Sequence, residues 1–190
     1  MKVIQLDQNN QKKSLVFLAG FMGSGKSTIG PILANALGWD YVDIDKNIEH
    51  KADQTIVDIF ASKGELAFRN LEREALRELL LHQQCVVALG GGTLANEENF
   101  EFIRQNGVIV YLQLSPEKIL ERIKHKTDRP MLKDAAGKPL EGEELQKRID
   151  GLLELREQYY AKADIIIPAG AMKVGTTVDA IVERLRGLLR

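Results

Sequence analysis

The nine residues GFMGSGKST at positions 20–28 combine glycines, a lysine and hydroxyl side chains at a spacing that suits phosphate binding. Gly20, Gly23 and Gly25 let successive backbone N–H groups curl around an anion, a path that side chains would obstruct. The apolar segment 15–19 precedes this stretch and a segment with helical periodicity follows it. That order of strand, loop and helix is the context a phosphate-binding loop requires, and a plain Gly/Ser-rich turn does not explain it.

The polar side chains of this phosphate loop predict a nucleoside triphosphate with Mg²⁺ as its ligand. Lys26 would neutralise the β- and γ-phosphates, and the hydroxyl of Ser27 would enter the coordination shell of the Mg²⁺. The helix that begins here would add unpaired N–H donors and the positive end of its dipole. We therefore expect nucleotide contacts from Gly23, Ser24, Gly25, Lys26, Ser27 and Thr28.

Two carboxylates, Asp43 and Asp45, follow the next apolar segment. Residues two apart in an extended chain point to the same side. One of the two would then hold Mg²⁺ through a water, while the other would face the hydroxyl of a phosphate acceptor. The simpler alternative is that Asp45 only caps a helix beginning near Lys46, and the phosphate loop upstream favours the first interpretation.

Two further groups of residues are candidates for binding the acceptor. Arg69 and Glu72 lie three residues apart on one face of a predicted helix. They form either a surface ion pair, which contributes little, or an arginine oriented by its neighbour to clasp a carboxylate. Gly90, Gly91 and Gly92 directly follow a predicted strand, and a substrate approaching bare backbone would explain the entropic cost of three glycines.

The bulk composition narrows the function classes. The 190 residues suffice for one domain with a substantial core. The 26 basic and 27 acidic residues nearly balance, which does not favour nucleic-acid or membrane partners. We find no signal-peptide core and no apolar stretch of membrane-spanning length. We therefore expect a cytoplasmic protein, by default a monomer.

The cysteine and the histidines give no sign of a metal or disulfide framework. Cys85 is the one cysteine and lies in an apolar segment, where it is expected to be buried. His50, His82 and His125 are far apart in sequence, without an i, i+4 pair or a cysteine partner. Surface or packing roles are therefore expected for all of them.

Strand-like apolar segments alternate along the chain with segments of helical periodicity. The strand-like segments are 15–19, 41–44, 85–89, 108–114 and 165–167, and helical spacing is clearest at 29–37, which Gly38 closes, and at 178–189. This alternation predicts a parallel sheet covered by helices on both faces. Ligands of such sheets bind beyond the carboxyl ends of the strands, so motifs that follow a strand carry the most weight.

The segment 126–144 breaks the alternation. It is polar, contains two prolines and two glycines and lacks a sustained apolar period. A connection of this length is either a disordered link or a functional lid. The pair Arg129-Pro130, suited to reaching over a bound phosphate, favours the lid. Residues 1–13 are expected to form a loose lead-in to the first strand.

The order of these motifs resembles that of the shikimate kinases. The resemblance covers nearly the whole chain from about Ser14. It rests on GFMGSGKST at 20–28, DID at 43–45, FRNLE at 68–72, GGG at 90–92, RPML at 129–132 and LREQYY at 155–160. Each motif is modest alone, but their joint order is specific. The resemblance implies a single-domain P-loop kinase fold, a five-stranded parallel sheet of order 2-3-1-4-5 flanked by helices, with a mobile lid.

The implied reaction moves the γ-phosphoryl group of ATP to the 3-hydroxyl of shikimate, a step of chorismate and aromatic amino acid biosynthesis. Mg²⁺ would be the cofactor, and ATP and shikimate the small-molecule partners. By match to the family, Asp45 would bind ring hydroxyls, and Arg69 and Arg156 would hold the carboxylate. Gly91, within the glycine triplet, would add backbone contacts.

On the nucleotide side, the resemblance implies that Arg129 meets the ATP phosphates from the lid and that Arg122 packs near adenine. Phosphoryl transfer asks mainly for positioning and positive charge. Lys26, Mg²⁺ and Arg129 would supply that charge, with Asp45 orienting the acceptor rather than acting as a strong base. Lys26, Asp45 and Arg129 are therefore the expected catalytic residues.

Two features depart from the family pattern. Glu157 and Gln158 stand where a proline and a leucine are frequent, and segment 168–177 lacks an arginine expected beside adenine. Lys173 or backbone contacts would substitute for that arginine.

Two other functions remain as alternatives. A kinase for another small hydroxy acid, such as gluconate, would not need both Arg69 and Arg156. A nucleotide-binding module without catalysis should have lost Lys26, Asp45 or Arg129, and all three are present.

Overall fold

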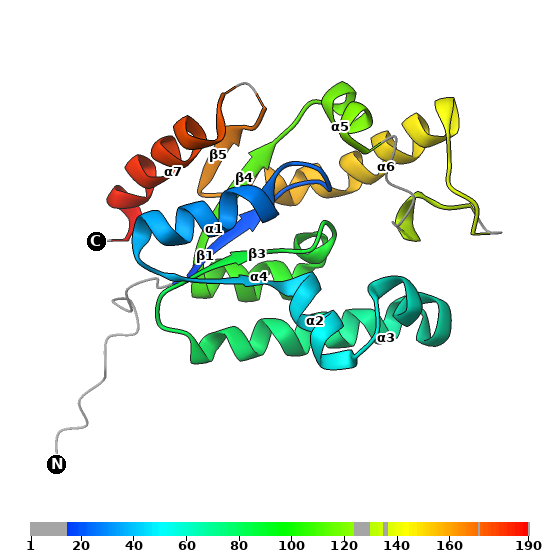
Figure 1. Ribbon diagram of the computed structural model, residues 1–190, viewed down its shortest axis with the longest axis horizontal. Helices are drawn as coiled ribbons and strands as arrows, with labels where there is room; N and C mark the ends of the chain where they lie inside the picture. Colours follow the sequence, from blue (N-terminus) through cyan, green and yellow to red (C-terminus); the bar gives the residue numbers. More distant parts are fainter. Residues whose placement is uncertain (1–14, 124–129, 135–136, 171, 190) are drawn as a thin grey trace, which may run out of the picture.

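The protein is described by a computed structural model over residues 15–123, 130–134, 137–170 and 172–189 (Figure 1). The strands of this part are β1 (Leu15–Ala19), β2 (Asp40–Asp43), β3 (Cys85–Ala88), β4 (Gly107–Gln113) and β5 (Ile165–Pro168). They form one sheet of order β2-β3-β1-β4-β5 in which every neighbouring pair is parallel. The expected strand order is therefore confirmed.

The strands form where the sequence is apolar without interruption, because helices cover both faces of the sheet. Every residue of β1 and β3 is buried, and so are the first six of β4. Val16 of β1 pairs with Val86 of β3 and with Val108 of β4 in the registers of the central strands. The second strand is one residue earlier than expected, because the chain turns into a helix at Ile44.

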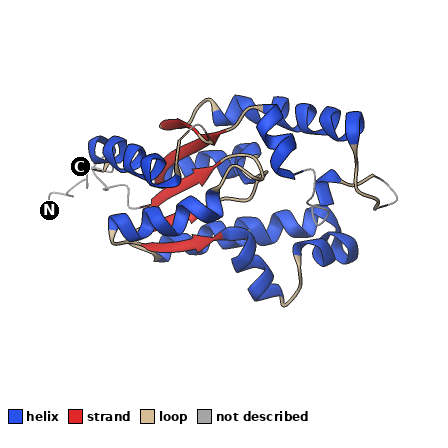
Figure 2. Cartoon of the chain, turned by 45° about the horizontal axis from the view of Figure 1, so that its top comes forward, coloured by secondary structure: helices blue, strands red, loops and turns tan. Residues whose placement is uncertain are grey.

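Helices cover the two faces of the sheet as separate layers (Figures 1 and 2). The helices of the described chain are α1 (Lys26–Leu37), α2 (Ile44–Ala52), α3 (Ile56–Glu78), α4 (Glu97–Asn106), α5 (Pro116–Ile123), α6 (Gly142–Tyr160) and α7 (Val174–Leu188). Short 3₁₀ turns are η2 (Leu79–Leu81), η3 (Thr93–Ala95) and η4 (Pro130–Leu132). Val16 and Leu18 point into the core beneath α1, α5, α6 and α7, whereas Phe17 points into the core beneath α2, α3 and α4.

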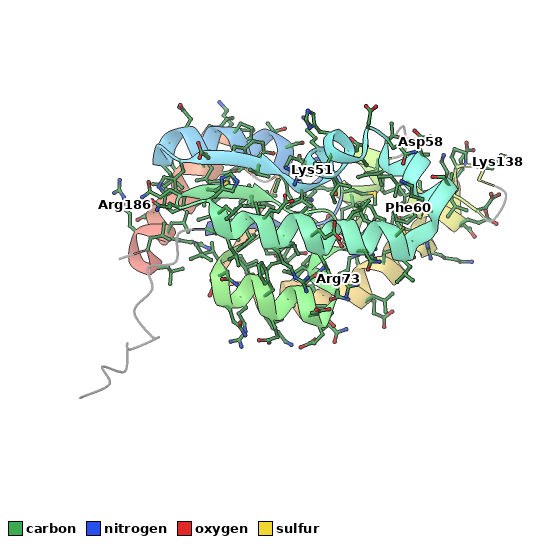
Figure 3. The ribbon with its side chains drawn as sticks, turned by 90° about the horizontal axis from the view of Figure 1, so that it is seen from below. Lys51, Asp58, Phe60, Arg73, Lys138 and Arg186 are labelled. Atoms are coloured by element: carbon green, nitrogen blue, oxygen red, sulfur yellow. The ribbon has the colours of Figure 1, made fainter. Side chains whose placement is uncertain are left out.

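In the layer formed by α2, α3 and α4, an ion pair joins α3 to α4. Viewed from below, α3 and α4 lie side by side across the sheet, with Arg73 of α3 between them (Figure 3). Its guanidinium forms an ion pair with Glu98 of α4 at 2.9 Å. Cys85 is fully buried in β3, as expected.

Local signals account for several helix ends. Gly38 closes α1 as expected, with φ at 69° and its N–H bonded to the carbonyls of Ala34 and Asn35. The N-cap of α2 is Asp43, whose side chain accepts a hydrogen bond from the N–H of Lys46. The expected backbone conformation at Asp43 and Asp45 is therefore corrected. The chain is extended at Asp43 but helical at Asp45, and the residue that caps the helix is Asp43 and not Asp45.

The described residues within 126–144 include regular structure. Leu132, the last residue of η4, is buried in the core, an isolated antiparallel bridge joins Lys133 to Pro139, and α6 begins at Gly142. The expected lid therefore overlaps the first turn of a helix. Arg129, His125 and residues 1–13 lie outside the described part of the chain. Among the described helices, none has the length and apolar character needed to cross a membrane.

Candidate active site

The phosphate loop connects β1 to α1 and depends on its glycines. Gly20, Gly23 and Gly25 have φ values of 146°, 82° and 102°, in the region that favours glycine. A Cβ added at Gly20 would lie 2.7 Å from Oγ of Ser24 and 2.8 Å from the carbonyl of Leu112, so the loop also packs too closely for a side chain there. The backbone requirement inferred from the sequence is confirmed.

The side chains of the phosphate loop divide into an inner and an outer set. Ser24 is buried, and its hydroxyl has no hydrogen-bond partner among the described residues. Ser27 and Thr28 are exposed at the first turn of α1. Nζ of Lys26 donates hydrogen bonds to the carbonyls of Gly20, at 2.7 Å, and of Phe21, at 3.2 Å. The ammonium group thus lies over the loop that it would serve.

A groove runs along the phosphate loop. Its lining includes Gly23, Gly25, Lys26, Ser27, Thr28, Asp43, Asp45, Gly91 and Arg122. The two carboxylates therefore share one groove, although the chain turns from β2 into α2 between them. This groove is the candidate nucleotide site.

Arg122 connects the phosphate loop to the segment after β5. Its Nη1 donates a hydrogen bond to the carbonyl of Gly23 at 2.8 Å. A Cβ added at Gly170 would lie 2.8 Å from Nη2 of the same guanidinium. Lys118 also reaches this segment, donating to the carbonyl of Gly170 at 3.2 Å, a contact that no motif indicated. Lys173, the expected substitute for a missing arginine, is the N-cap residue of α7.

A second, smaller pocket adjoins the groove. We call it the acceptor pocket; its lining consists of Met22, Asp45, Ile56, Phe60, Phe68, Arg69, Glu72, Gly90, Gly91, Gly92, Met131 and Arg156. Met22, Asp45, Ile56 and Gly91 line both cavities. The two cavities are therefore parts of one continuous site, and the structure brings together Asp45, the glycine triplet and both candidate arginines.

The ion pair between Arg69 and Glu72 is not a surface one, because the carboxylate of Glu72 is buried. Glu72 is 1% exposed, its Oε2 lies 3.0 Å from Nη1 of Arg69, and its Oε1 accepts a hydrogen bond from Thr93 at 2.6 Å. Glu65 holds the other side of the guanidinium at 3.0 Å. Burial opposes the charge on Arg69, but the two carboxylates outweigh it and raise the pKa of the arginine.

Arg156 reaches the acceptor pocket from α6 on the opposite side. It is 4% exposed, and its guanidinium carbon lies 5.0 Å from the ring centre of Phe21 in the phosphate loop. Its Nη1 is buried without a hydrogen-bond partner among the described residues. Burial lowers the pKa of Arg156, and the positive charge of Arg69 lowers it further. A buried cation with an unused donor suits an anionic ligand.

The two guanidinium groups converge on the end of the glycine triplet. A Cβ added at Gly92 would lie 3.2 Å from Nη2 of Arg69 and 3.6 Å from Nη2 of Arg156. A planar carboxylate can accept paired hydrogen bonds from such forks. The acceptor pocket therefore fits a small molecule that carries a carboxylate at this end and faces Asp45 elsewhere.

Fold and site together define a P-loop phosphotransferase in which a pocket for a small anionic acceptor adjoins the nucleotide groove. The family model described as shikimate kinase matches residues 22–186. The chain therefore belongs to the shikimate kinase family.

Similar proteins agree with this assignment. The shikimate kinase of Chlorobaculum parvum is 48% identical over 177 residues, covering 93% of this chain and 95% of that protein. The shikimate kinase of Chlorobaculum tepidum is 47% identical, with 93% of each chain covered. The solved shikimate kinase of Acinetobacter baumannii in complex with shikimate superposes with a TM-score of 0.82 at 32% identity, covering 92% of this chain and 93% of that one.

Sequence reasoning missed the apolar wall of the acceptor pocket. Phe68, Met22 and Met131 belong to motifs that were singled out for their charged or glycine residues, so their positions carried a usable signal. Ile56 and Phe60 carried none, because apolar residues at helical spacing are typical of an ordinary core.

Proposed function

We propose that the chain transfers the γ-phosphoryl group of ATP to the 3-hydroxyl of shikimate. The observation that supports this most strongly is the convergence of Arg69 and Arg156 on an acceptor pocket that opens into the phosphate-loop groove. A carboxylate held by both arginines would leave the ring hydroxyls near Asp45, which lines both cavities. The relatives named shikimate kinase favour this acceptor over other hydroxy acids.

Lys26, Asp45 and Arg129 would perform the chemistry by positioning and by charge. Nζ of Lys26 rests 2.7 Å from the carbonyl of Gly20, and rotation of its flexible stem would carry it to the β- and γ-phosphates. Asp45 would hold and orient the acceptor hydroxyl, since a loose transition state demands little basicity. For Arg129, in the proposed lid at 126–144, the support is its place in the RPML motif.

The residues of the groove fit Mg²⁺. The exposed hydroxyl of Ser27 and the carboxylate of Asp43 are hard oxygen ligands in the same cavity. Asp43 already accepts hydrogen bonds from the N–H of Lys46 at 3.3 Å and from the hydroxyl of Tyr41 at 3.4 Å, which suits contact through a water. When bound, Mg²⁺ would neutralise charge on the phosphates.

We also propose that the protein is a cytoplasmic monomer. Its buried free thiol, Cys85, suits a reducing compartment. The most exposed large apolar side chains, Leu66, Leu81 and Leu155, lie on separate elements, α3, η2 and α6. Such scattered residues do not form the apolar patch that an obligate dimer buries.

The decisive experiment measures ADP release with ATP, Mg²⁺ and shikimate, and identifies the phosphorylated product by mass and NMR. Shikimate should be phosphorylated at its 3-hydroxyl, with a kcat/KM far above that for gluconate. Equal turnover of gluconate, or no turnover of shikimate above background, would contradict the proposal.

A further inference from the structure

Tyr160 is a buried polar side chain beside the acceptor pocket that the proposed mechanism does not use. It ends α6, one helical turn after Arg156, so both side chains lie on the same face of the helix. Tyr160 is only 1% exposed. A buried phenol normally needs a partner for its hydroxyl, and the identity of that partner links Tyr160 to the site.

The hydroxyl of Tyr160 donates a hydrogen bond to the carbonyl of Gly91 at 2.9 Å. Gly91 is the middle residue of the glycine triplet and lines both cavities. A Cβ added at Gly91 would lie 3.6 Å from Nη1 of Arg156. The Gly91 turn therefore adjoins both the phenol of Tyr160 and the guanidinium of Arg156. Because the hydroxyl gives its single hydrogen to Gly91, its lone pairs remain available to the guanidinium of Arg156, and Tyr160 opposes the lowering of the arginine's pKa by burial.

The ring of Tyr160 packs against a side chain of the sheet. It stacks on Tyr111 of β4, with ring centres 4.6 Å apart and an angle of 22° between the planes. Tyr111 is itself buried in a central strand. Packing against the sheet therefore restricts the position of the Tyr160 hydroxyl, and with it the Gly91 turn and the neighbouring Arg156.

We propose that Tyr160 is a positioning residue for the acceptor carboxylate: its hydroxyl fixes the Gly91 turn and holds Arg156 in the orientation that binds the acceptor. This inference rests on the proposed function, because it assigns the carboxylate of shikimate to Arg156. Burial raises the pKa of Tyr160 to about 12, so the hydroxyl keeps its hydrogen throughout the neutral range.

The test is Tyr160→Phe, which removes the hydroxyl and keeps the ring on Tyr111. The KM for shikimate should rise roughly three- to tenfold, the scale of one lost hydrogen bond, whereas the KM for ATP should change by less than about twofold. Tyr159→Phe is the matched control, since this neighbouring ring packs on Phe100 outside the pocket, and both KM values should be unchanged.

A second substrate separates positioning from simple loss of stability. With the methyl ester of shikimate, which lacks the carboxylate charge, the Tyr160→Phe penalty on kcat/KM should largely disappear. An unchanged KM for shikimate in Tyr160→Phe, or an equal penalty with the ester, would overturn the inference while leaving the proposed function intact. Absence of shikimate turnover by the unaltered protein would instead overturn both.

Discussion

At the scale of single residues, Gly90 is needed for packing between charged side chains. A Cβ added there would lie 2.7 Å from Oδ1 of Asp45, 2.9 Å from Oγ1 of Thr93 and 3.2 Å from Oε1 of Glu72. The first glycine of the triplet therefore makes room for the carboxylates and the hydroxyl of the pocket wall. Gly91 and Gly92 instead face the guanidinium groups, at 3.2 to 3.6 Å from an added Cβ. One motif thus satisfies two different steric needs.

Glu72→Gln should weaken acceptor binding, because the amide keeps the shape of the buried carboxylate but removes the charge that orients Arg69. We expect the KM for shikimate to rise about tenfold or more, the scale of a lost charge-assisted hydrogen bond, with little change in the KM for ATP. Steady-state kinetics in both substrates measure this. Glu65→Gln is the matched control: Glu65 contacts the same guanidinium but is 56% exposed, so its effect should be much smaller. Equal effects of the two variants would contradict the role given to Glu72.

Lys26→Ala should act on catalysis more than on binding of the acceptor. Loss of one charged donor at the transferring phosphoryl group is expected to lower kcat by about two orders of magnitude or more. The KM for shikimate should stay within a few-fold, since Lys26 does not line the acceptor pocket. Single-turnover measurements would separate the chemical step from product release. A kcat like that of the unaltered protein would refute the assignment.

At the scale of elements, α3 is broken at Gly64, and the break shapes the pocket wall. Gly64 has φ at 79° and ψ at 173°, which is not helical. Phe60 precedes it and Phe68 follows it, yet their ring centres are 4.9 Å apart. In a straight helix, eight residues advance by roughly 12 Å. The break therefore folds the first turns of α3 back, so that both rings face one cavity.

Gly64→Ala should destabilise the protein through the backbone alone. Nothing lies within 4 Å of an added Cβ at Gly64, so the cost, about 1–3 kcal/mol, comes from a conformation that side chains disfavour. Urea unfolding measures this change. Gly151→Ala is the control: Gly151 lies inside α6, also with free space around an added Cβ, and the substitution should stabilise by up to about 1 kcal/mol. Equal changes at both positions would show that α3 is helical through Gly64.

Sequence patterns predicted the elements whose signals are local and missed those set by tertiary packing. Buried parallel strands are apolar throughout, so all five strands and the closing role of Gly38 were predictable. The N-cap at Asp43 was not predicted, because Asp43 and Asp45 are equally able to accept a hydrogen bond from the backbone N–H three residues later. The break at Gly64 was not predicted, because a single glycine within a helical pattern is tolerated at a cost of about 1 kcal/mol and does not by itself indicate a break.

In the candidate site, too, residues with a local sequence signal could be predicted and residues placed by tertiary packing could not. Asp45 and Arg69 could be named because charged residues after a strand or paired on a helix face carry a chemical signal, whereas Arg156 was named only through the family resemblance. Tyr160 could be named only as part of a motif, because its partner Gly91 is distant in sequence. The apolar wall gave no distinct signal at Ile56 and Phe60.

At the scale of the whole molecule, the site is assembled from loops after several strands of one sheet. The phosphate loop follows β1, Asp45 follows β2 and the glycine triplet follows β3, and these strands are neighbours in the order β2-β3-β1. Carboxyl ends of parallel strands meet at one edge, which is where such sheets bind ligands. The continuity of the two cavities is thus a consequence of strand order.

Ligand-induced stabilisation should reflect that continuity. ADP with Mg²⁺ at about 100 times its Kd should add roughly 2.7 kcal/mol to the free energy of unfolding, and shikimate a similar amount. At about 2–4 °C per kcal/mol, each ligand should raise the Tm by about 5–10 °C, and both together by at least the sum. Differential scanning fluorimetry measures this. No shift with shikimate, with or without nucleotide, would contradict the acceptor assignment.

The packing of Phe21 on Arg156 has a practical consequence for compounds directed at this enzyme family. The ring belongs to the phosphate loop, but the guanidinium 5.0 Å from it belongs to the acceptor pocket. A movement of the loop on nucleotide binding would therefore be felt at Arg156, the end of the neighbouring cavity proposed to bind the carboxylate. Inhibitor screens against that cavity should therefore be run with and without nucleotide, and compounds that contact Arg156 are the ones whose potency should depend on it.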